Sequence, residues 1–169
     1  MVHLPLGVLN MRNPKKFYIL GIDPGLLTGI TLYLCENKQI TRIWAKEVGE
    51  VEVDFLIEET IAELAPDIEI INEKFFITER TYKLPDCPWS LEKTGVIKYM
   101  CNKYGVDYNW QSPSEAKDFC PDSRLRNLNE WFVGGEGHAR DAIRHVITHV
   151  VNLYRLNLPG ILVDDEEDE

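Results

Sequence analysis

The sequence lacks three features that would place it in other classes of protein. It has no apolar run long enough to span a bilayer, so we expect no contact with a membrane. Positive charge is scarce, because 18 Lys and Arg residues stand against 28 Asp and Glu residues and the formal net charge is −10. Cysteine is also scarce, since the chain has only Cys35, Cys87, Cys101 and Cys120. No two of them form a CxxC pair, which disfavours a zinc ribbon, and their scattered positions disfavour a disulfide framework.

The acidic balance limits the kinds of partner that the chain can bind. Six acidic residues form the run Asp164 to Glu169, which predicts a solvated, disordered tail over 161–169. The remaining acidity argues against indiscriminate binding to nucleic acid but leaves room for a local basic groove. In residues 1–16 the basic residues follow the apolar ones, which is the reverse of a secretory signal. We therefore expect a loose N-terminal arm and a cytoplasmic protein.

The segment between these ends, 17–160, has the length and apolar content of one α/β domain with a full core. The patterns predict three antiparallel strands joined by short turns, then a helix, a strand, a helix, a strand, two short helical pieces and a last helix. The expected ranges are 17–23, 29–35, 39–46, 51–65, 68–71, 90–104 with Ser90 as the N-cap, 106–111, pieces from 112 and 122, and 138–156. In the third strand we expect Ile40, Arg42 and Trp44 to share one face.

The chain is organised around the stretch Phe17 to Gly29, FYILGIDPGLLTG. Four apolar residues predict a buried strand that ends in a turn containing Pro24 and Gly25. Asp23 therefore stands where a core strand meets a turn. Such an acid can simply cap the turn, so its importance depends on which other polar groups lie near it.

Two later segments supply candidate partners for Asp23. Glu73 follows a short strand that comes after a crossover helix, and such a strand usually lies parallel to a neighbour. If that neighbour is the first strand, Glu73 and Asp23 end at the same edge of the sheet. On the last helix, His138 and Asp141 are three residues apart and share a face.

Three carboxylates and a histidine would then surround one point. Oxygen ligands of this kind suit Mg²⁺ or Mn²⁺ rather than zinc. Two such ions, about 3.5–4 Å apart, are a common arrangement for cutting a phosphodiester bond. The sequence thus predicts a metal-dependent nuclease with Asp23, Glu73 and Asp141 as metal ligands and His138 as a fourth catalytic group.

Other interpretations of these residues stay open at this point. Glu73 can be a solvated acid at a strand end, Asp141 can pair only with Arg140 or Arg144, and His138 can merely begin a helix. His145 and His149, four residues apart, can bind zinc together with Asp141. Phe75 and Phe76 can pack in a loop instead of stacking on bases.

Together the residues resemble RuvC-type Holliday junction resolvases of the RNase H-like (retroviral integrase) superfamily. The resemblance is carried by GIDPG at 21–25, by Glu73, and by HARDA at 138–142, and it covers about 17–156. The compact length and the SPSEAK box at 112–117 are similar to bacteriophage members. The resemblance implies a five-stranded mixed sheet, three antiparallel strands then two parallel ones, flanked by helices.

The resemblance also implies roles for individual residues. Asp23, Glu73 and Asp141 match the metal-binding carboxylates, and His138 stands where some members have histidine and others an acid. Phe76 matches an aromatic residue that stacks on bases, and Lys117 resembles a basic residue that contacts DNA near the cut phosphate. Lys74 and Phe75, beside Phe76, join them as candidate DNA contacts.

The implied function is a magnesium- or manganese-dependent endonuclease that resolves branched DNA by paired nicks, as a homodimer with two ions in each active site. If the chain is phage-encoded, it acts in the bacterial host cytoplasm. Flaps, forks or RNA-containing duplexes are alternative substrates, and a non-catalytic DNA-binding module is an alternative function. An actin-like or sugar-kinase-like nucleotide binder is disfavoured because a second phosphate-binding box is missing, so we expect no nucleotide cofactor.

Overall fold

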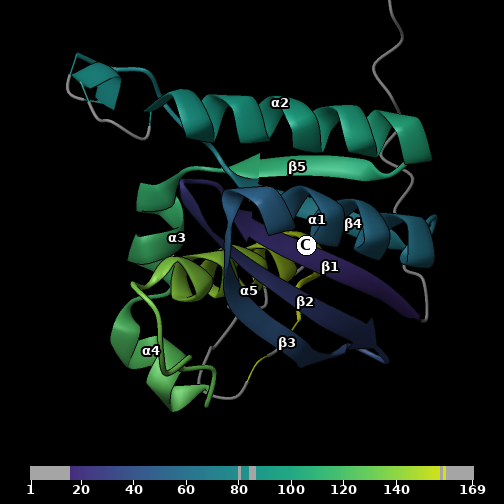
Figure 1. The fold of residues 1–169 in the computed structure, drawn as a ribbon. Coiled ribbons are helices and arrows are strands. Elements are labelled where there is room, and N and C mark those ends of the chain that lie inside the picture. The colour runs from purple at the N-terminus through teal and green to yellow at the C-terminus, as the bar shows by residue number, and fades with distance from the viewer. Residues whose placement is uncertain (1–15, 80, 84–86, 157, 159–169) are drawn as a thin grey trace, which may run out of the picture.

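A computed structural model describes residues 16–79, 81–83, 87–156 and 158 of the chain. The predicted arm over 1–16 and tail over 161–169 lie outside the described residues, except for Lys16. One mixed sheet runs through the middle of the molecule in the order β3-β2-β1-β4-β5 (Figure 1). Its strands are β1 (Lys16–Asp23), β2 (Leu27–Glu36), β3 (Gln39–Gly49), β4 (Ile68–Glu73) and β5 (Asp107–Gln111).

The predicted five-stranded mixed sheet is confirmed. β1 pairs antiparallel with β2 and β2 with β3, whereas β1–β4 and β4–β5 are parallel pairs. The parallel pairs follow from the crossover helices, which return the chain to the edge at which the preceding strand began. As a result, the carboxyl ends of β1, β4 and β5 lie together at one edge of the sheet.

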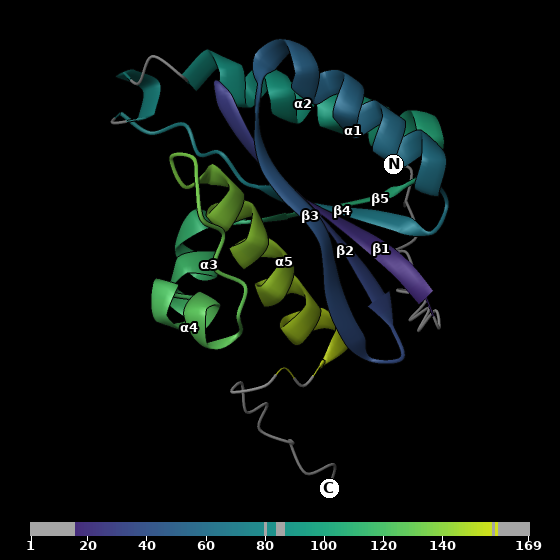
Figure 2. The same ribbon diagram turned by 60° about the horizontal axis from the view of Figure 1, so that its bottom comes forward.

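Helices cover both faces of the sheet (Figure 2). One face carries α1 (Glu50–Leu64) and α2 (Cys87–Tyr104), and the other carries α5 (His138–Tyr154) with the short helices α3 (Pro113–Phe119) and α4 (Asp122–Asn127). A single turn of 3₁₀ helix, η1, spans Thr81–Lys83. The core accordingly has two parts, one on each side of the sheet. None of the helices in the described ranges has the length and apolarity that crossing a bilayer requires.

Two local predictions were wrong. A β-bulge pairs Leu32 with Trp44 and Tyr33 with Arg42, so Ile43 is skipped and the alternation of β3 is reversed beyond it. Ile40 consequently packs in the core part under α5, and Trp44 packs in the other. In addition, α2 begins at Cys87, so Ser90 is not its N-cap. The buried Ser90 hydroxyl instead donates a hydrogen bond of 2.9 Å to the carbonyl of Pro24.

Two glycines allow α5 to lie directly against the sheet. A Cβ placed on Gly29 would lie 2.0 Å from the carbonyl oxygen of His138. A Cβ on Gly21 would lie 2.7 Å from the carbonyl oxygen of Ala142 and 2.5 Å from a methyl group of Val146. Any side chain at these positions would therefore push the start of α5 away from β1 and β2.

Candidate metal centre

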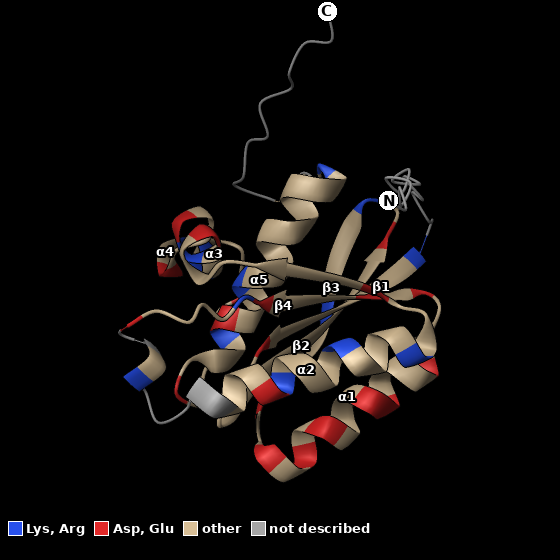
Figure 3. Ribbon diagram, turned by 90° about the horizontal axis from the view of Figure 1, so that it is seen from above, with Lys and Arg blue, Asp and Glu red and all other residues tan. Residues whose placement is uncertain are grey.

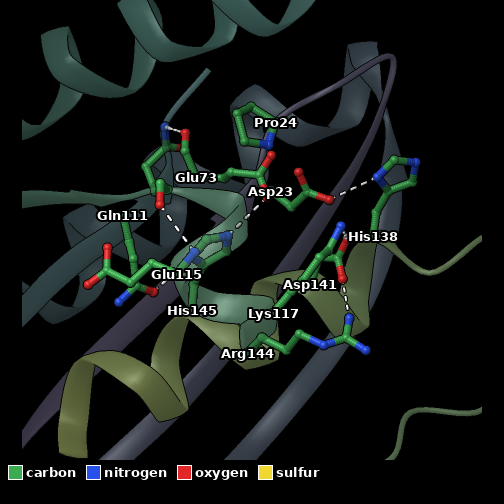
Figure 4. Close-up of polar contacts among 12 residues, drawn as sticks. Asp23, Pro24, Glu73, Gln111, Glu115, Lys117, His138, Asp141, Arg144 and His145 are labelled. Atoms are coloured by element: carbon green, nitrogen blue, oxygen red, sulfur yellow. Dashed lines mark hydrogen bonds and ion pairs between the residues drawn. The ribbon is translucent and has the colours of Figure 1, made fainter. Parts of the chain in front are cut away.

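Three carboxylates meet where β1 and β4 end and α5 begins (Figure 4). Asp23 is the last residue of β1, Glu73 is the last residue of β4, and Asp141 lies in the first turn of α5. Each offers one oxygen atom, and the three oxygens lie within 4.8 Å of one another. The sequence predicted that Asp23 and Glu73 meet at the ends of two parallel strands and that the start of the last helix brings Asp141 to them. The role of the three residues as metal ligands stays a prediction.

Burial and the neighbouring acids raise the pKa of Asp23. The residue is only 6% exposed, and burial raises the pKa of its carboxyl to about 6, with the charges of Glu73 and Asp141 adding to the rise. The hydrogen bond from His138 acts in the opposite direction. A divalent cation beside Asp23 would favour its ionised form, and hard oxygen donors of this kind favour Mg²⁺ or Mn²⁺.

His138 is in contact with the acid cluster. Its Nδ1 lies 2.9 Å from Oδ2 of Asp23, and its side chain is 37% exposed. The hydrogen bond to Asp23 raises the pKa of the imidazole more than burial lowers it. His138 is thus more than the residue that begins a helix, because it bonds to the most buried of the three acids.

Two cations lie beside Asp141, from different elements. Lys117 of α3 places its Nζ 3.0 Å from Oδ2 of Asp141, and Arg144 of α5 donates to Oδ1. Burial lowers the pKa of Lys117, but Asp141, Glu73 and Asp23 together raise it by more than burial lowers it. The pKa of Lys117 is therefore above its ordinary value. Asp141 therefore forms the predicted ion pair with Arg144 and also belongs to the acid cluster. Lys117 lies next to the acids, where the resemblance placed a basic residue.

Sequence reasoning missed the group that holds Glu73. His145 of α5 is fully buried, with its Nε2 3.0 Å from Oε2 of Glu73 and its Nδ1 3.0 Å from Oε1 of Gln111. Both ring nitrogens therefore face oxygens and fix the orientation of the ring. The possible zinc site formed by His145, His149 and Asp141 is wrong, because His145 contacts Glu73 and His149 contacts Glu69, and within the described ranges Asp141 groups with Asp23 and Glu73 instead.

A second missed residue holds the start of α5. Glu47 of β3 accepts backbone hydrogen bonds from Glu136, Gly137 and Ala139, at 2.7, 2.8 and 3.2 Å. These bonds outweigh the effect of burial and lower the pKa of Glu47. Since no side chain of α5 caps its own N-terminus, this carboxylate from a distant strand takes that role. No local sequence signal indicates it, because the partners are about ninety residues apart.

Helix α2 holds the two strand ends from the opposite face of the sheet. Ser90 bonds to the carbonyl of Pro24, directly after Asp23, as described above. One turn later, the Thr94 hydroxyl lies 3.5 Å from Nδ2 of Asn72, whose amide also donates to the carbonyl of Glu73. The strand ends that carry Asp23 and Glu73 are thus both joined to the same helix.

A polar cavity of about 450 Å³ opens beside the acid cluster. Its lining includes Lys117, Arg140 and Arg144 together with His138 and Asp141. Arg140 stacks on the Trp131 ring, with its guanidinium carbon 4.8 Å from the ring centre. The lining also includes the acids Asp122 and Glu136, and Lys117 and Arg144 are paired with Asp141. The cavity therefore joins Asp141 of the acid cluster to three cations that an anionic group can contact.

The remaining predicted DNA contacts follow Glu73 along the chain. Phe76 is 45% exposed, and Nζ of Lys74 lies 4.8 Å above its ring centre. Phe75 is half-buried. These three residues lie next to the acid cluster in sequence, but none of them bonds to it in the part of the chain that the structure describes.

No protein-family model and no curated protein matches the chain. Solved structures do match. RuvC of Thermus thermophilus in complex with a Holliday junction substrate has a TM-score of 0.64 at 15% identity, over 82% of this chain and 96% of that one. A second T. thermophilus RuvC structure gives 0.62 at 16%, over 84% and 99%. The fowlpox virus Holliday junction resolvase gives 0.53 at 13%, over 81% and 100%. The chain therefore has the RuvC-type resolvase fold that its motifs predicted.

Proposed function

We propose that the chain is a metal-dependent endonuclease that resolves Holliday junctions by paired nicks in DNA. The observation that carries the proposal is the convergence of Asp23, Glu73 and Asp141, whose ligand atoms lie within 4.8 Å of one another at one edge of a resolvase-like sheet. The three carboxylates would hold Mg²⁺ or Mn²⁺. When bound, two such ions would supply an activated water and neutralise the leaving oxygen.

The protein residues around the acids have separate tasks in this proposal. His138 orients Asp23 through the 2.9 Å hydrogen bond and is placed to accept or donate a proton at the exposed side of its ring. Lys117 and the arginines of the adjacent cavity would hold the phosphate that is cut. Lys74, Phe75 and Phe76 would contact the DNA beyond it. Homodimerisation would place two such sites on one junction.

Support for DNA as the substrate comes from the comparisons and from charge. One T. thermophilus structure contains a Holliday junction substrate, and one fowlpox resolvase structure contains Holliday junction DNA. Each of the two matches at least 80% of this chain. Two cations, Lys117 and Arg144, stand within ion-pair distance of the acid cluster. A phosphodiester bond is the anionic group that such a mixture of acids and cations can hold together with divalent ions.

The test is cleavage of a labelled four-way junction in Mg²⁺ or Mn²⁺, beside linear duplex, flap and fork substrates. We expect wild type to nick the junction symmetrically and Asp23→Asn to be inactive while keeping its circular dichroism spectrum and melting temperature. Cutting of flaps or forks alone would retain the chemistry and reject the junction as the substrate. If wild type binds junctions but cuts nothing in either metal, the chain is a binding module and the proposal fails.

A further inference from the structure

An aromatic and basic surface lies on the edge strand β5, on the opposite side of the sheet from the acids. We call it the Trp110 patch, and it consists of Lys74, Phe76, Lys98, Tyr108 and Trp110. Trp110 is 51% exposed, and Nζ of Lys98 and Nζ of Lys74 lie 4.3 and 5.2 Å from the centre of its ring system. The Tyr108 ring meets Trp110 edge-on at 6.0 Å.

The patch is a short step along the backbone from the acid cluster. Glu73 pairs with Gln111 in the β4–β5 register, and the amide of Lys74 donates a 2.8 Å hydrogen bond to the carbonyl of Gln111. Because side chains alternate along a strand, Gln111 points toward His145 and Trp110 points to the face that carries α2. A DNA strand that passes from the acids over Lys74 would therefore reach Trp110, the neighbour of Gln111 in β5.

The charges of the patch favour a polyanion. Within the described residues, neither Lys74 nor Lys98 forms an ion pair with a carboxylate, whereas Lys93 and Lys103 on the same helix pair with Asp54 and Glu58. The aromatic rings instead hold the two ammonium groups through cation–π contacts. On the neighbouring helix α1, acidic residues are concentrated along the helix, which repels DNA from that side (Figure 3).

We infer that the Trp110 patch binds the DNA strand next to the cut: Lys74 and Lys98 move from the Trp110 ring to phosphates, and the ring stacks on an unstacked base. Continuous base stacking is interrupted at a branch point but not inside a linear duplex, so a contact that stacks on a base would favour branched DNA. The inference rests on the proposed nuclease function. It adds Trp110 and Lys98 to the substrate contacts and assigns them different tasks.

The test measures binding of a labelled four-way junction and of a linear duplex with the same arm sequence to the full chain in EDTA. We expect Trp110→Ala to weaken junction binding about tenfold and duplex binding less than about twofold, with Trp110→Phe retaining most of the affinity. Lys98→Gln should weaken both substrates alike and reduce the slope of log affinity against log salt by about one. Heats of Mn²⁺ binding should be unchanged in all three variants.

Lys46→Gln is the matched control. Its Nζ lies 4.8 Å from the centre of the Trp44 ring system on β3, at the opposite edge of the sheet, so it removes the same charge from the same kind of contact. If Lys46→Gln weakens binding as much as Lys98→Gln, the effect is one of net charge and the inference fails. The inference also fails if Trp110→Ala binds the junction like wild type. It fails as well if the Trp110→Ala substitution changes the mass of the free protein in sedimentation, because the patch would then be an interface between copies of the chain.

These outcomes are separate from the fate of the proposed function. Wild type that cuts junctions, together with patch variants that bind normally, would reject the patch and keep the nuclease. Wild type that neither binds nor cuts DNA would reject both.

Discussion

Two carboxylate–histidine pairs join β4 to α5, and they differ in what the protein leaves for a ligand. Glu69 and Glu73 lie on one face of β4, and His145 and His149 lie one turn apart on α5. The Glu73–His145 distance is 3.0 Å and the Glu69–His149 distance is 3.1 Å. Residue type and contact geometry are therefore nearly the same in the two pairs.

The second oxygen of each carboxylate marks the difference. Oε1 of Glu69 faces His149 and Oε2 accepts a 3.0 Å hydrogen bond from Tyr154, so both oxygens have protein partners. Burial, and then the charge of Glu69, raises the pKa of Tyr154 and keeps its hydroxyl a donor. In Glu73, Oε2 faces His145, while Oε1 accepts no hydrogen bond from the residues that the structure describes.

Glu69, with protein partners on both oxygens, is part of the core. Glu73 has one oxygen without a hydrogen bond from the described residues and lies beside two other acids, so that oxygen is available to a cation. Exposure agrees with this division, since the side chain of Glu73 is 18% exposed and that of Glu69 is 10% exposed. A nearby histidine alone does not distinguish the two situations. The following predictions test the division.

The largest expected effect comes from the matched substitutions Glu73→Gln and Glu69→Gln. We expect Glu73→Gln to lower the cleavage rate by more than about 100-fold, because loss of a ligand should exceed the effect of losing a residue that only supports one. Glu69→Gln should keep the activity and lower the free energy of unfolding by about 1–3 kcal/mol, since the amide replaces one of the two oxygens that contact His149 and Tyr154. Junction cleavage and urea unfolding measure the two. Equal losses of activity would contradict the comparison.

A smaller effect is expected at the histidines. His145→Ala should weaken Mn²⁺ binding by about 10–100-fold in calorimetry, because Glu73 loses the group that orients it. His149→Ala should leave Mn²⁺ affinity unchanged although it also removes a buried side chain. The unfolding midpoints of the two variants serve as the control for general damage. If both variants lose metal affinity in proportion to their stability, His145 has no orienting role.

The smallest effect is expected at Glu47, which lies near the site but, like Glu69, has partners on both oxygens. Glu47→Gln should lower the free energy of unfolding by about 1 kcal/mol at pH 7, the usual contribution of a helix cap. Because the folded state lowers the pKa of Glu47, its contribution is present above the ordinary value of 4.5 and is lost as the pH falls through the lower, folded-state pKa. The stability difference between wild type and variant should therefore shrink in urea titrations below that pH. A difference that persists at low pH would mean that the charge of Glu47 is irrelevant.

The positions of four predicted site residues could be read from the sequence because each stands at or near the end of a regular element: Asp23, Glu73, His138 and Asp141. Asp23 and Glu73 end strands whose parallel pairing follows from the crossover helix between them, and helical periodicity places His138 and Asp141 on one face. The order of the helices and strands followed from the same patterns, and the resemblance implied the five-stranded mixed sheet. The meeting of Asp23 with Glu73 needed only the rule that parallel strands end at one edge of the sheet. The approach of His138 and Asp141 needed the further expectation that the glycine-rich lead-in brings the last helix over those strand ends.

The supporting contacts could not be read in this way. The contact between His145 and Glu73 depends on the rotation of α5 over the sheet, and the Glu47 cap depends on the register of β3. The bulge at Ile43 changes that register by one residue, which no alternation in the sequence signals. These contacts are set by long-range packing, so a local pattern contains no information about them.

Because Gly21 and Gly29 have no side chains, the geometry of the site is less sensitive to substitutions in the rest of the core. Because the backbone of α5 rests on the backbones of β1 and β2, the separation between Asp23 and Asp141 is set by contact of main chain with main chain. Substitutions among the apolar residues in the rest of the core can then alter stability without moving the acids. The distance between the Asp23 and Asp141 carboxylates therefore does not depend on which apolar residues fill the surrounding core.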